Sequence, residues 1–175
     1  MTTEFVTPRT LPVPDLPVLA PERPEDAAAV GALIDAAFGP GRYAKAAERL
    51  RENNTLLPEL SFTAHSGHAL VGTVRMWPIR IGETPAIFLG PIAVDPSWRS
   101  RGLGAALVMR ACEATREAGH HLILLVGDPP FFNPLGFSQV PPGRLVMPGP
   151  VDPPRLLARA LTPGADQGLE GVVRV

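Results

Sequence analysis

The chain has 175 residues, 45% of them hydrophobic, and its 16 basic and 17 acidic residues give a formal net charge of −1. This length allows one globular domain with a real core, spanning residues 1–175, and excludes two large domains. Because there is no cationic surplus to neutralise phosphates, we expect no nucleic-acid partner. The single cysteine, Cys112, excludes an intrachain disulfide and a multi-cysteine metal site.

The sequence shows no targeting or membrane segment. Its first residues lack a basic region followed by an apolar stretch, so they do not resemble a signal peptide. The longest apolar runs, residues 85–94 and 122–126, are much shorter than the roughly 20 residues that cross a bilayer. We therefore expect a soluble, cytoplasmic protein with no membrane partner.

The first third of the chain predicts an edge strand followed by two helices. Prolines crowd the start, so we expect residues 1–15 to form an extended lead-in and residues 16–20 an edge strand. Pro24 and the two carboxylates after it favour the start of a helix that ends before Gly39. A second, shorter helix is predicted over residues 43–52, and its charged side chains are expected in solvent: Lys45, Glu48, Arg49 and Arg51.

The middle of the chain predicts three strands, a long helix and a buried strand. Short turn sequences separate the strand formers of residues 61–65, 69–81 and 85–94, which favours an antiparallel meander. Helical spacing of apolar residues predicts a helix over residues 101–118. The continuously apolar residues 122–126 are typical of a strand buried on both faces, so the chain returns through a parallel crossover.

The last part of the chain predicts only short elements. Residues 131–135 can form no more than a helical turn, and residues 155–161 are expected to form a short helix. Late strands are predicted over residues 137–140, 145–147 and 171–175. The fold class is thus a mixed α/β sheet, an antiparallel meander followed by a parallel β-α-β crossover. We expect the proline-rich residues 141–175 to pack on the same domain.

The segment between the third meander strand and the long helix has the features of an anion-binding loop. It contains two arginines, Arg99 and Arg101, and two glycines, Gly102 and Gly104. Unpaired N–H groups and the positive end of the helix dipole converge there, and glycine lets an anion approach the backbone closely. This pattern predicts a phosphate site at the start of the helix.

Two common phosphate loops fit this segment poorly. A Walker-type loop needs Lys-Ser/Thr after its last glycine, and here Ala105 and Ala106 follow. A dinucleotide fingerprint would use Asp128 for the ribose, but its third small position is Leu107 and antiparallel strands precede the loop. Nicotinamide-dependent redox chemistry is therefore the weakest alternative.

A third kind of phosphate loop matches better. The residues Val94-x-Pro96-x-x-Arg99-x-Arg101-Gly102-Leu103-Gly104-x-x-Leu107 resemble the acyl-CoA motif of the GCN5-related N-acetyltransferases. The order of elements over residues 16–140 is also similar to that family. A second segment resembles a branch of uncharacterised bacterial members: Asp128-Pro129-Pro130-Phe131-Phe132-x-x-x-Gly136-Phe137.

This resemblance implies how the donor binds. In the family the fourth strand splays from the fifth, and pantetheine lies in the gap against the main chain of the fourth. Gly90-Pro91 supplies a physical reason, because proline within a strand favours a bulge or lost pairing. The implied donor is acetyl-CoA, and no metal is implied. The residues matched to its binding are Ile92, Ala93, Val94, Arg99, Arg101, Gly102, Leu103, Gly104, Ala105, Phe131 and Phe132.

The resemblance also implies direct attack of an amine on the thioester, with no covalent enzyme intermediate. The matched catalytic positions are the backbone at Val94, and Phe132, which stands where many relatives have a tyrosine acid. Asp128, beyond the buried strand, is a candidate base. Residues 85–94 contain no carboxylate to serve as base. Other candidate bases lie elsewhere: Glu83, His65 and His68. Cys112 is expected to be buried filler rather than a nucleophile.

The acceptor implied by the resemblance is a primary amine of a small molecule or peptide. Tyr43 lies between the two early helices, a region that shapes the acceptor pocket in relatives, so it is a candidate for substrate contact. A homodimer is possible. Because Phe132 lacks a hydroxyl and no base lies on the fourth strand, a non-catalytic acyl-CoA-binding or regulatory module is the alternative function.

Overall fold

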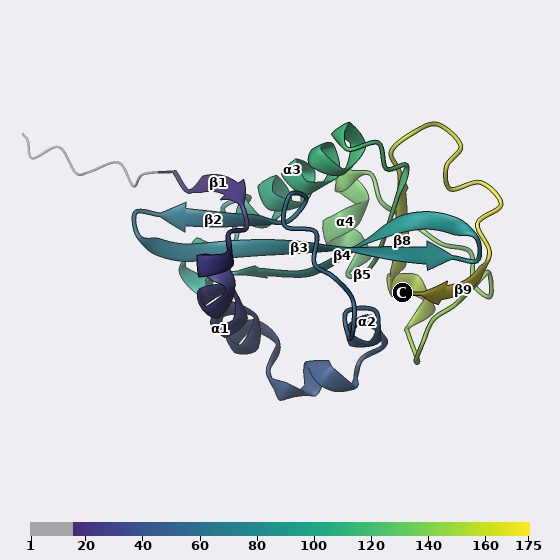
Figure 1. Ribbon diagram of the computed structural model, residues 1–175, viewed down its shortest axis with the longest axis horizontal. Helices are drawn as coiled ribbons and strands as arrows, with labels where there is room; N and C mark the ends of the chain where they lie inside the picture. The colour runs from purple at the N-terminus through teal and green to yellow at the C-terminus, as the bar shows by residue number, and fades with distance from the viewer. Residues whose placement is uncertain (1–15) are drawn as a thin grey trace, which may run out of the picture.

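The computed structural model describes residues 16–175 and shows a nine-stranded mixed sheet with helices on both faces (Figure 1). The predicted lead-in, residues 1–15, lies outside the described residues. The strands follow the order β1-β2-β3-β4-β5-β8-β6, and β9 pairs with both β3 and β7. Their bounds are β1 (Val18–Pro21), β2 (Phe62–Ser66), β3 (Ala69–Ile81), β4 (Thr84–Val94), β5 (Leu122–Val126), β6 (Ser138–Gln139), β7 (Leu145–Val146), β8 (Leu156–Ala160) and β9 (Gly171–Arg174).

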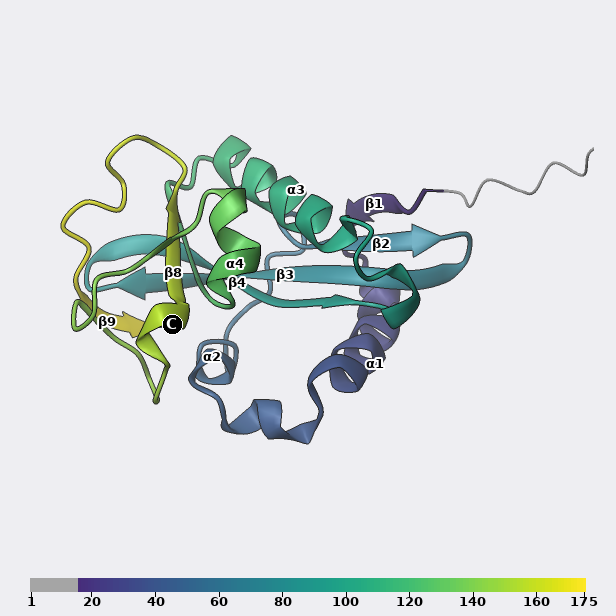
Figure 2. The same cartoon turned by 180° about the vertical axis from the view of Figure 1, so that it is seen from behind.

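The predicted meander and crossover are both confirmed. Strands β2, β3 and β4 pair antiparallel, and β5 pairs parallel to β4 after the long helix α3 (Leu103–Glu117). Helix α1 (Ala27–Phe38) and the short α2 (Ala46–Arg49) lie on one side of the sheet, and α3 lies on the other (Figures 1 and 2). In the described residues, no helix is both long enough and apolar enough to span a bilayer.

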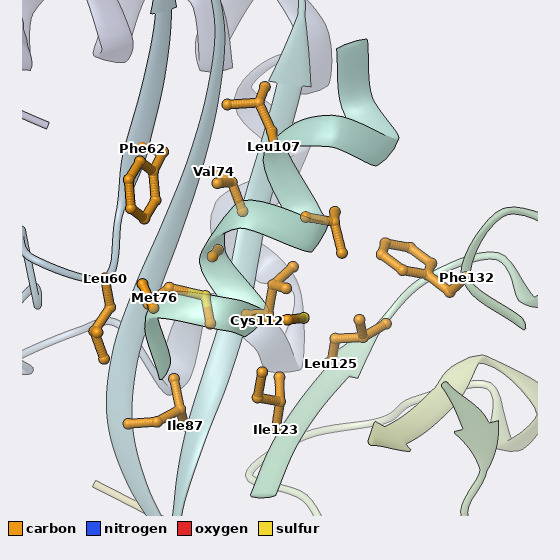
Figure 3. Packing of buried hydrophobic residues seen from close by; sticks show 14 of the residues in the cluster. Leu60, Phe62, Val74, Met76, Ile87, Leu107, Cys112, Ile123, Leu125 and Phe132 are labelled. Carbon is orange, nitrogen blue, oxygen red and sulfur yellow. The ribbon is translucent and has the colours of Figure 1, made fainter. Parts of the chain in front are cut away.

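The main core lies between α3 and the sheet (Figure 3). The apolar face of α3 buries Leu107, Val108 and Ala111 against side chains of β2, β3 and β5. Cys112 lies in the same layer with 2% of its surface exposed, as expected for a packing residue. Burial raises the pKa of its thiol to about 11, so the sulfur stays protonated at neutral pH.

Two of the predicted helices differ from the structure. Residues 43–52 do not form one helix: a 3₁₀ segment (Pro40–Ala44) precedes the single turn of α2. The predicted helix over residues 155–161 is wrong, because Leu156–Ala160 form strand β8. Leucine and alanine favour a helix locally, but β5 offers an open edge, and pairing along all five residues of β8 outweighs that propensity.

Strands β4 and β5 are paired over only a short stretch. Their register pairs are Ile87 with Ile123 and Phe88 with Leu124. Beyond Phe88 the β4 strand continues beside β3 alone, with a register shift opposite Gly90-Pro91. The indole Nε1 of Trp77 donates to the carbonyl oxygen of Gly90 at 2.7 Å and fixes the backbone there. The two strands are therefore open from each other along the second half of β4, as the resemblance implied.

Candidate active site

A cavity of about 640 Å³ lies where β4 and β5 separate. It is lined by residues of both faces of the sheet, from the α2 region on one side to the start of α3 on the other. We call the part formed by Val94, Arg99, Gly102, Gly104 and Phe131 the α3 end. The part formed by Phe38, Arg42, Lys45, Glu48 and Arg51 is the α2 end.

Main-chain groups of β4 face the opening between the strands. The N–H of Asp95 donates to the carbonyl of Val71 at 2.9 Å, so these two residues form a hydrogen-bonded pair. Pairs alternate along an antiparallel ladder, which assigns the polar groups of Ala93 to β3 and turns those of Ile92 and Val94 toward the opening. The side chains of Ile92 and Val94 line the cavity, whereas Ala93 is buried against α1.

The N-terminus of α3 presents free backbone donors to the cavity. Gly102 takes the left-handed conformation, with φ of 80°, and places the helix start beside Val94. Within the described residues, no hydrogen bond is made by the N–H groups of Leu103, Gly104 or Ala105. A β-carbon at Gly104 would lie 3.4 Å from the ring of Phe131, so glycine keeps the space between helix and ring open. This end can hold an anion through backbone N–H groups and the helix dipole.

The two arginines of the loop point in different directions. The Nε of Arg99 donates to the carbonyl oxygen of Val94 at 3.1 Å, and its side chain lines the cavity. The guanidinium of Arg101 lies 5.1 Å from the ring centroid of Trp98 and does not line the cavity. The structure thus brings Arg99, but not Arg101, to the α3 end.

Phenylalanine rings form a wall beside the opening. Phe132 is 6% exposed and meets Phe131 edge to face, with ring centroids 4.8 Å apart. Its other side packs on Phe137 at 5.6 Å. A β-carbon at Gly127, at the end of β5, would overlap the Phe132 ring. Helix α4 (Pro129–Phe132) therefore places its last ring in a space that only glycine leaves free. Figure 3 shows the Phe132 ring near Leu125.

The α2 end contains charged groups that sequence reasoning placed in solvent. The side chains of Glu48 and Arg51 are only 12% and 13% exposed. Glu48 Oε2 accepts from Arg51 Nη1 at 2.8 Å and lies 3.5 Å from Nη1 of Arg42. Arg49, by contrast, is exposed as predicted. The expectation for Glu48 and Arg51 was wrong because α2 and the residues just after it pack these two side chains against the end of the cavity.

The candidate bases lie in very different places. Asp128 lines the cavity, and its carboxylate is 3.2 Å from Nη2 of Arg155. Glu83 is 91% exposed at the β3–β4 hairpin, and His68 is exposed in the β2–β3 turn. His65 Nε2 lies 3.5 Å from the buried carboxylate of Asp26. Of these four groups, only Asp128 is at the cavity.

Tyr43 supports the site without lining it. Its hydroxyl oxygen accepts from Nη2 of Arg42 at 2.6 Å, and the same nitrogen is 2.8 Å from Asp35 Oδ1. Arg42, one residue earlier, is the group that reaches the cavity. Within residues 16–175, no cluster of three or more His, Cys, Asp or Glu side chains is arranged to hold a metal ion.

Several residues that line the cavity were not among those predicted from the sequence. Phe38 ends α1, and Asp152 and Arg155 precede β8, whose position depends on strand pairing far along the chain. No local pattern marks these residues. Glu48 and Arg51 are three residues apart, which allows them to pair, but this spacing does not indicate that they line a cavity.

Comparisons with known proteins agree with this architecture. The family model described as Acetyltransferase (GNAT) family matches residues 28–137. The chain is 30% identical over 119 residues to the uncharacterized N-acetyltransferase YhbS of Escherichia coli strain K12. The aligned residues cover 67% of this chain and 71% of that protein.

Solved structures give the same result. The structure of YhbS from Escherichia coli in complex with CoA has a TM-score of 0.78 at 25% identity and covers 95% of this chain and 92% of that one. A GNAT family acetyltransferase from Brucella melitensis in complex with acetyl-CoA has a TM-score of 0.60 at 27% identity, covering 81% and 94%. With its motif, its open β4–β5 pair and these relatives, the chain belongs to the GNAT family of acetyltransferases and is an N-acetyltransferase.

Proposed function

We propose that this N-acetyltransferase transfers an acetyl group from acetyl-CoA to a primary amine by direct attack within a ternary complex. The observation that carries the proposal is the opening between β4 and β5 beyond Phe88, which runs into the cavity at the start of α3. Two relatives of similar fold are described in complex with CoA or acetyl-CoA, which supports the same donor here.

The donor is held mainly by backbone groups in this proposal. Its diphosphate binds the free N–H groups of Leu103, Gly104 and Ala105 at the positive end of α3, and Arg99 adds a charge-assisted bond. Pantetheine lies along β4 against the outward-facing groups of Ile92 and Val94. Phe131 and Phe132 form the apolar wall beside it.

The reaction has two parts, attack of the amine on the thioester and departure of the sulfur. As the amine nitrogen bonds to the thioester carbon, the carbonyl oxygen gains negative charge, and N–H groups of β4 near Val94 stabilise it. The C–S bond then breaks, and sulfur leaves as a thiolate. Since a thiol pKa is near 8.5, leaving without an acid at pH 7 costs only about 2 kcal/mol. Phe132 can therefore replace the tyrosine of other family members without abolishing turnover.

Removing the proton of the amine is the harder step. A lysine-like ammonium lies about 3.4 units above pH 7, so its neutral form costs roughly 4.6 kcal/mol. Asp128, one of three carboxylates that line the cavity, accepts this proton, directly or through water, and Arg155 orients it. The departing thiolate takes its proton from solvent.

Two measurements test the proposal. Calorimetric titration is expected to show saturable acetyl-CoA binding, and no binding at a few hundred micromolar would reject it. Release of free CoA thiol is then followed across a panel of primary amines. Saturable, amine-dependent release supports catalysis, whereas binding without any amine-dependent release favours the passive acyl-CoA-binding module.

A further inference from the structure

The α2 end of the cavity has an excess of positive charge. Three cationic side chains line it, those of Arg42, Lys45 and Arg51, beside the carboxylate of Glu48. Over the whole cavity, five cationic side chains face the three carboxylates of Glu48, Asp128 and Asp152. Glu48 Oε2 is shared between the two guanidinium groups, at 2.8 Å and 3.5 Å. Lys45 makes no ion pair with any residue in the range 16–175. The Asp35 carboxylate, which also pairs with Arg42, lies outside the cavity lining.

Arg51 is the most deeply placed of these cations. Its Nε is buried and has no hydrogen-bond partner among the described residues. A buried donor without a partner is destabilising, because the group has lost its hydrogen bond to water and gained none in the protein. Burial also lowers the pKa of this guanidinium, and Glu48 only partly offsets that effect. The arginine is therefore held at the cavity with less negative charge around it than a cation normally requires.

The position of Arg51 relates it to the reacting groups. A β-carbon at Gly90 would lie 3.2 Å from Nη2 of Arg51, and the guanidinium carbon is 5.8 Å from the centroid of the Phe88 ring. Phe88 is the last β4 residue paired with β5. The guanidinium thus lies where the two strands begin to separate, close to the part of β4 along which the proposed acyl donor runs.

We propose that the acceptor amine of this enzyme carries an anionic oxygen group, a carboxylate or a phosphate, which binds Arg51 and Lys45 at the α2 end. Arginine matches either anion through paired N–H donors, and lysine adds a mobile point charge. The same field repels di- and polycationic amines, so it selects against polyamines. This inference rests on the proposed acetyl transfer and specifies its acceptor class.

Matched pairs of amines test the proposal. We would measure kcat/KM by CoA thiol release for β-alanine against β-alanine amide, and for phosphoethanolamine against ethanolamine, with putrescine as a dication. At least one anionic member is expected to exceed its neutral partner by about tenfold or more, and putrescine to be the poorest. Whichever pair shows the larger ratio distinguishes a carboxylate from a phosphate.

Substitutions test whether residues of the α2 end cause the preference for anionic over neutral amines. Lys45→Glu reverses an exposed charge without disturbing the core, and Arg51→Met removes the buried guanidinium. Each is expected to reduce the anionic-to-neutral ratio by about tenfold. Arg49→Met is the control, because Arg49 lies between Lys45 and Arg51 in the chain, is exposed and does not line the cavity. Its ratio should equal that of the unaltered protein.

Equal or better use of the neutral amines by the unaltered protein would overturn the anionic acceptor and leave acetyl transfer intact. Failure of acetyl transfer itself would appear differently, as absent thiol release with every amine. In that case the same amines are titrated calorimetrically into the protein with and without acetyl-CoA. Saturable binding of an anionic amine that Lys45→Glu weakens would support the anion site, and absence of such binding would overturn it.

Discussion

The two ends of the cavity are lined by different kinds of groups, mainly backbone N–H groups at the α3 end and side chains at the α2 end. At the α3 end, one short segment presents free backbone N–H groups to the cavity, with glycine at two positions and one arginine. At the α2 end, side chains from α1, the 3₁₀ segment, α2 and the residues that flank α2 meet in space. A site formed by the backbone of one segment is visible as a compact sequence motif. A site formed by side chains of several segments corresponds to residues that are scattered along the sequence.

This difference has a functional meaning. The α3 end suits a constant group such as a diphosphate, because backbone geometry hardly changes when side chains are substituted. The α2 end can vary without disturbing the helix start, so it is suited to choosing among acceptors. Substitutions at the first end should therefore affect the donor, and substitutions at the second should affect the acceptor.

The largest effect is expected from Gly104→Asp. It places a carboxylate beside the free N–H groups where we propose that the diphosphate binds, and acetyl-CoA affinity should fall by about a hundredfold, roughly 2.7 kcal/mol. Titration calorimetry measures the acetyl-CoA affinity of the variant and of the unaltered protein. Ala106→Asp is the control, since Ala106 is exposed two residues further along α3 and outside the cavity lining. Similar losses in both variants would contradict a local site.

Gly127→Ala tests the wall of phenylalanine rings beside the β4–β5 opening. The new methyl group overlaps the Phe132 ring, and the displaced ring should lower the free energy of unfolding by about 1–3 kcal/mol in urea denaturation. Gly31→Ala is the matched control, because Gly31 lies within α1 with open space around it and should gain about 0.5–1 kcal/mol. An unchanged stability for Gly127→Ala would show that the ring moves freely.

The two loop arginines sharpen the description of the α3 end. Arg99 lines the cavity, so Arg99→Met should weaken acetyl-CoA binding by about tenfold. Arg101 rests on Trp98, and Arg101→Met should change affinity less than about threefold. Calorimetric titration of both variants gives the comparison. Equal losses would show that Arg101 leaves Trp98 to bind phosphate, as the family resemblance implied.

The smallest effect is expected from Phe132→Tyr. The added hydroxyl can protonate the leaving sulfur, but the thiolate already leaves at a cost of about 2 kcal/mol, and partial proton transfer recovers only part of it. The steady-state kcat should rise by less than about tenfold. Phe131→Tyr, on the neighbouring ring, controls for added polarity. A rise of a hundredfold would mean that leaving-group protonation limits the enzyme.

Much of the fold could be predicted because its signals are local. The apolar run of β5, the helical spacing of α3 and the turns of the meander each specify their own element, and the Arg99–Gly104 motif marks the α3 end. Residues 155–161 show the limit. Their composition favours a helix, and only the open edge of β5, which lies about thirty residues earlier in the chain, makes them a strand.

The α2 end could not be predicted for the same reason. Glu48 and Arg51 have the spacing of an ordinary solvated helix surface, and nothing near them in sequence reveals that β4 lies against that surface. Tyr43 was a candidate for substrate contact because it lies between the two early helices, but Arg42 beside it reaches the cavity. Partners distant in sequence determine which of two neighbouring residues faces inward.

A crystal structure with bound CoA tests the account most directly. In that structure we expect the diphosphate oxygens within hydrogen-bond distance of the N–H groups of Leu103, Gly104 and Ala105. We expect pantetheine between β4 and β5, hydrogen-bonded to the main chain of Ile92 and Val94. A CoA molecule bound outside the β4–β5 opening, with those N–H groups in solvent, would contradict it.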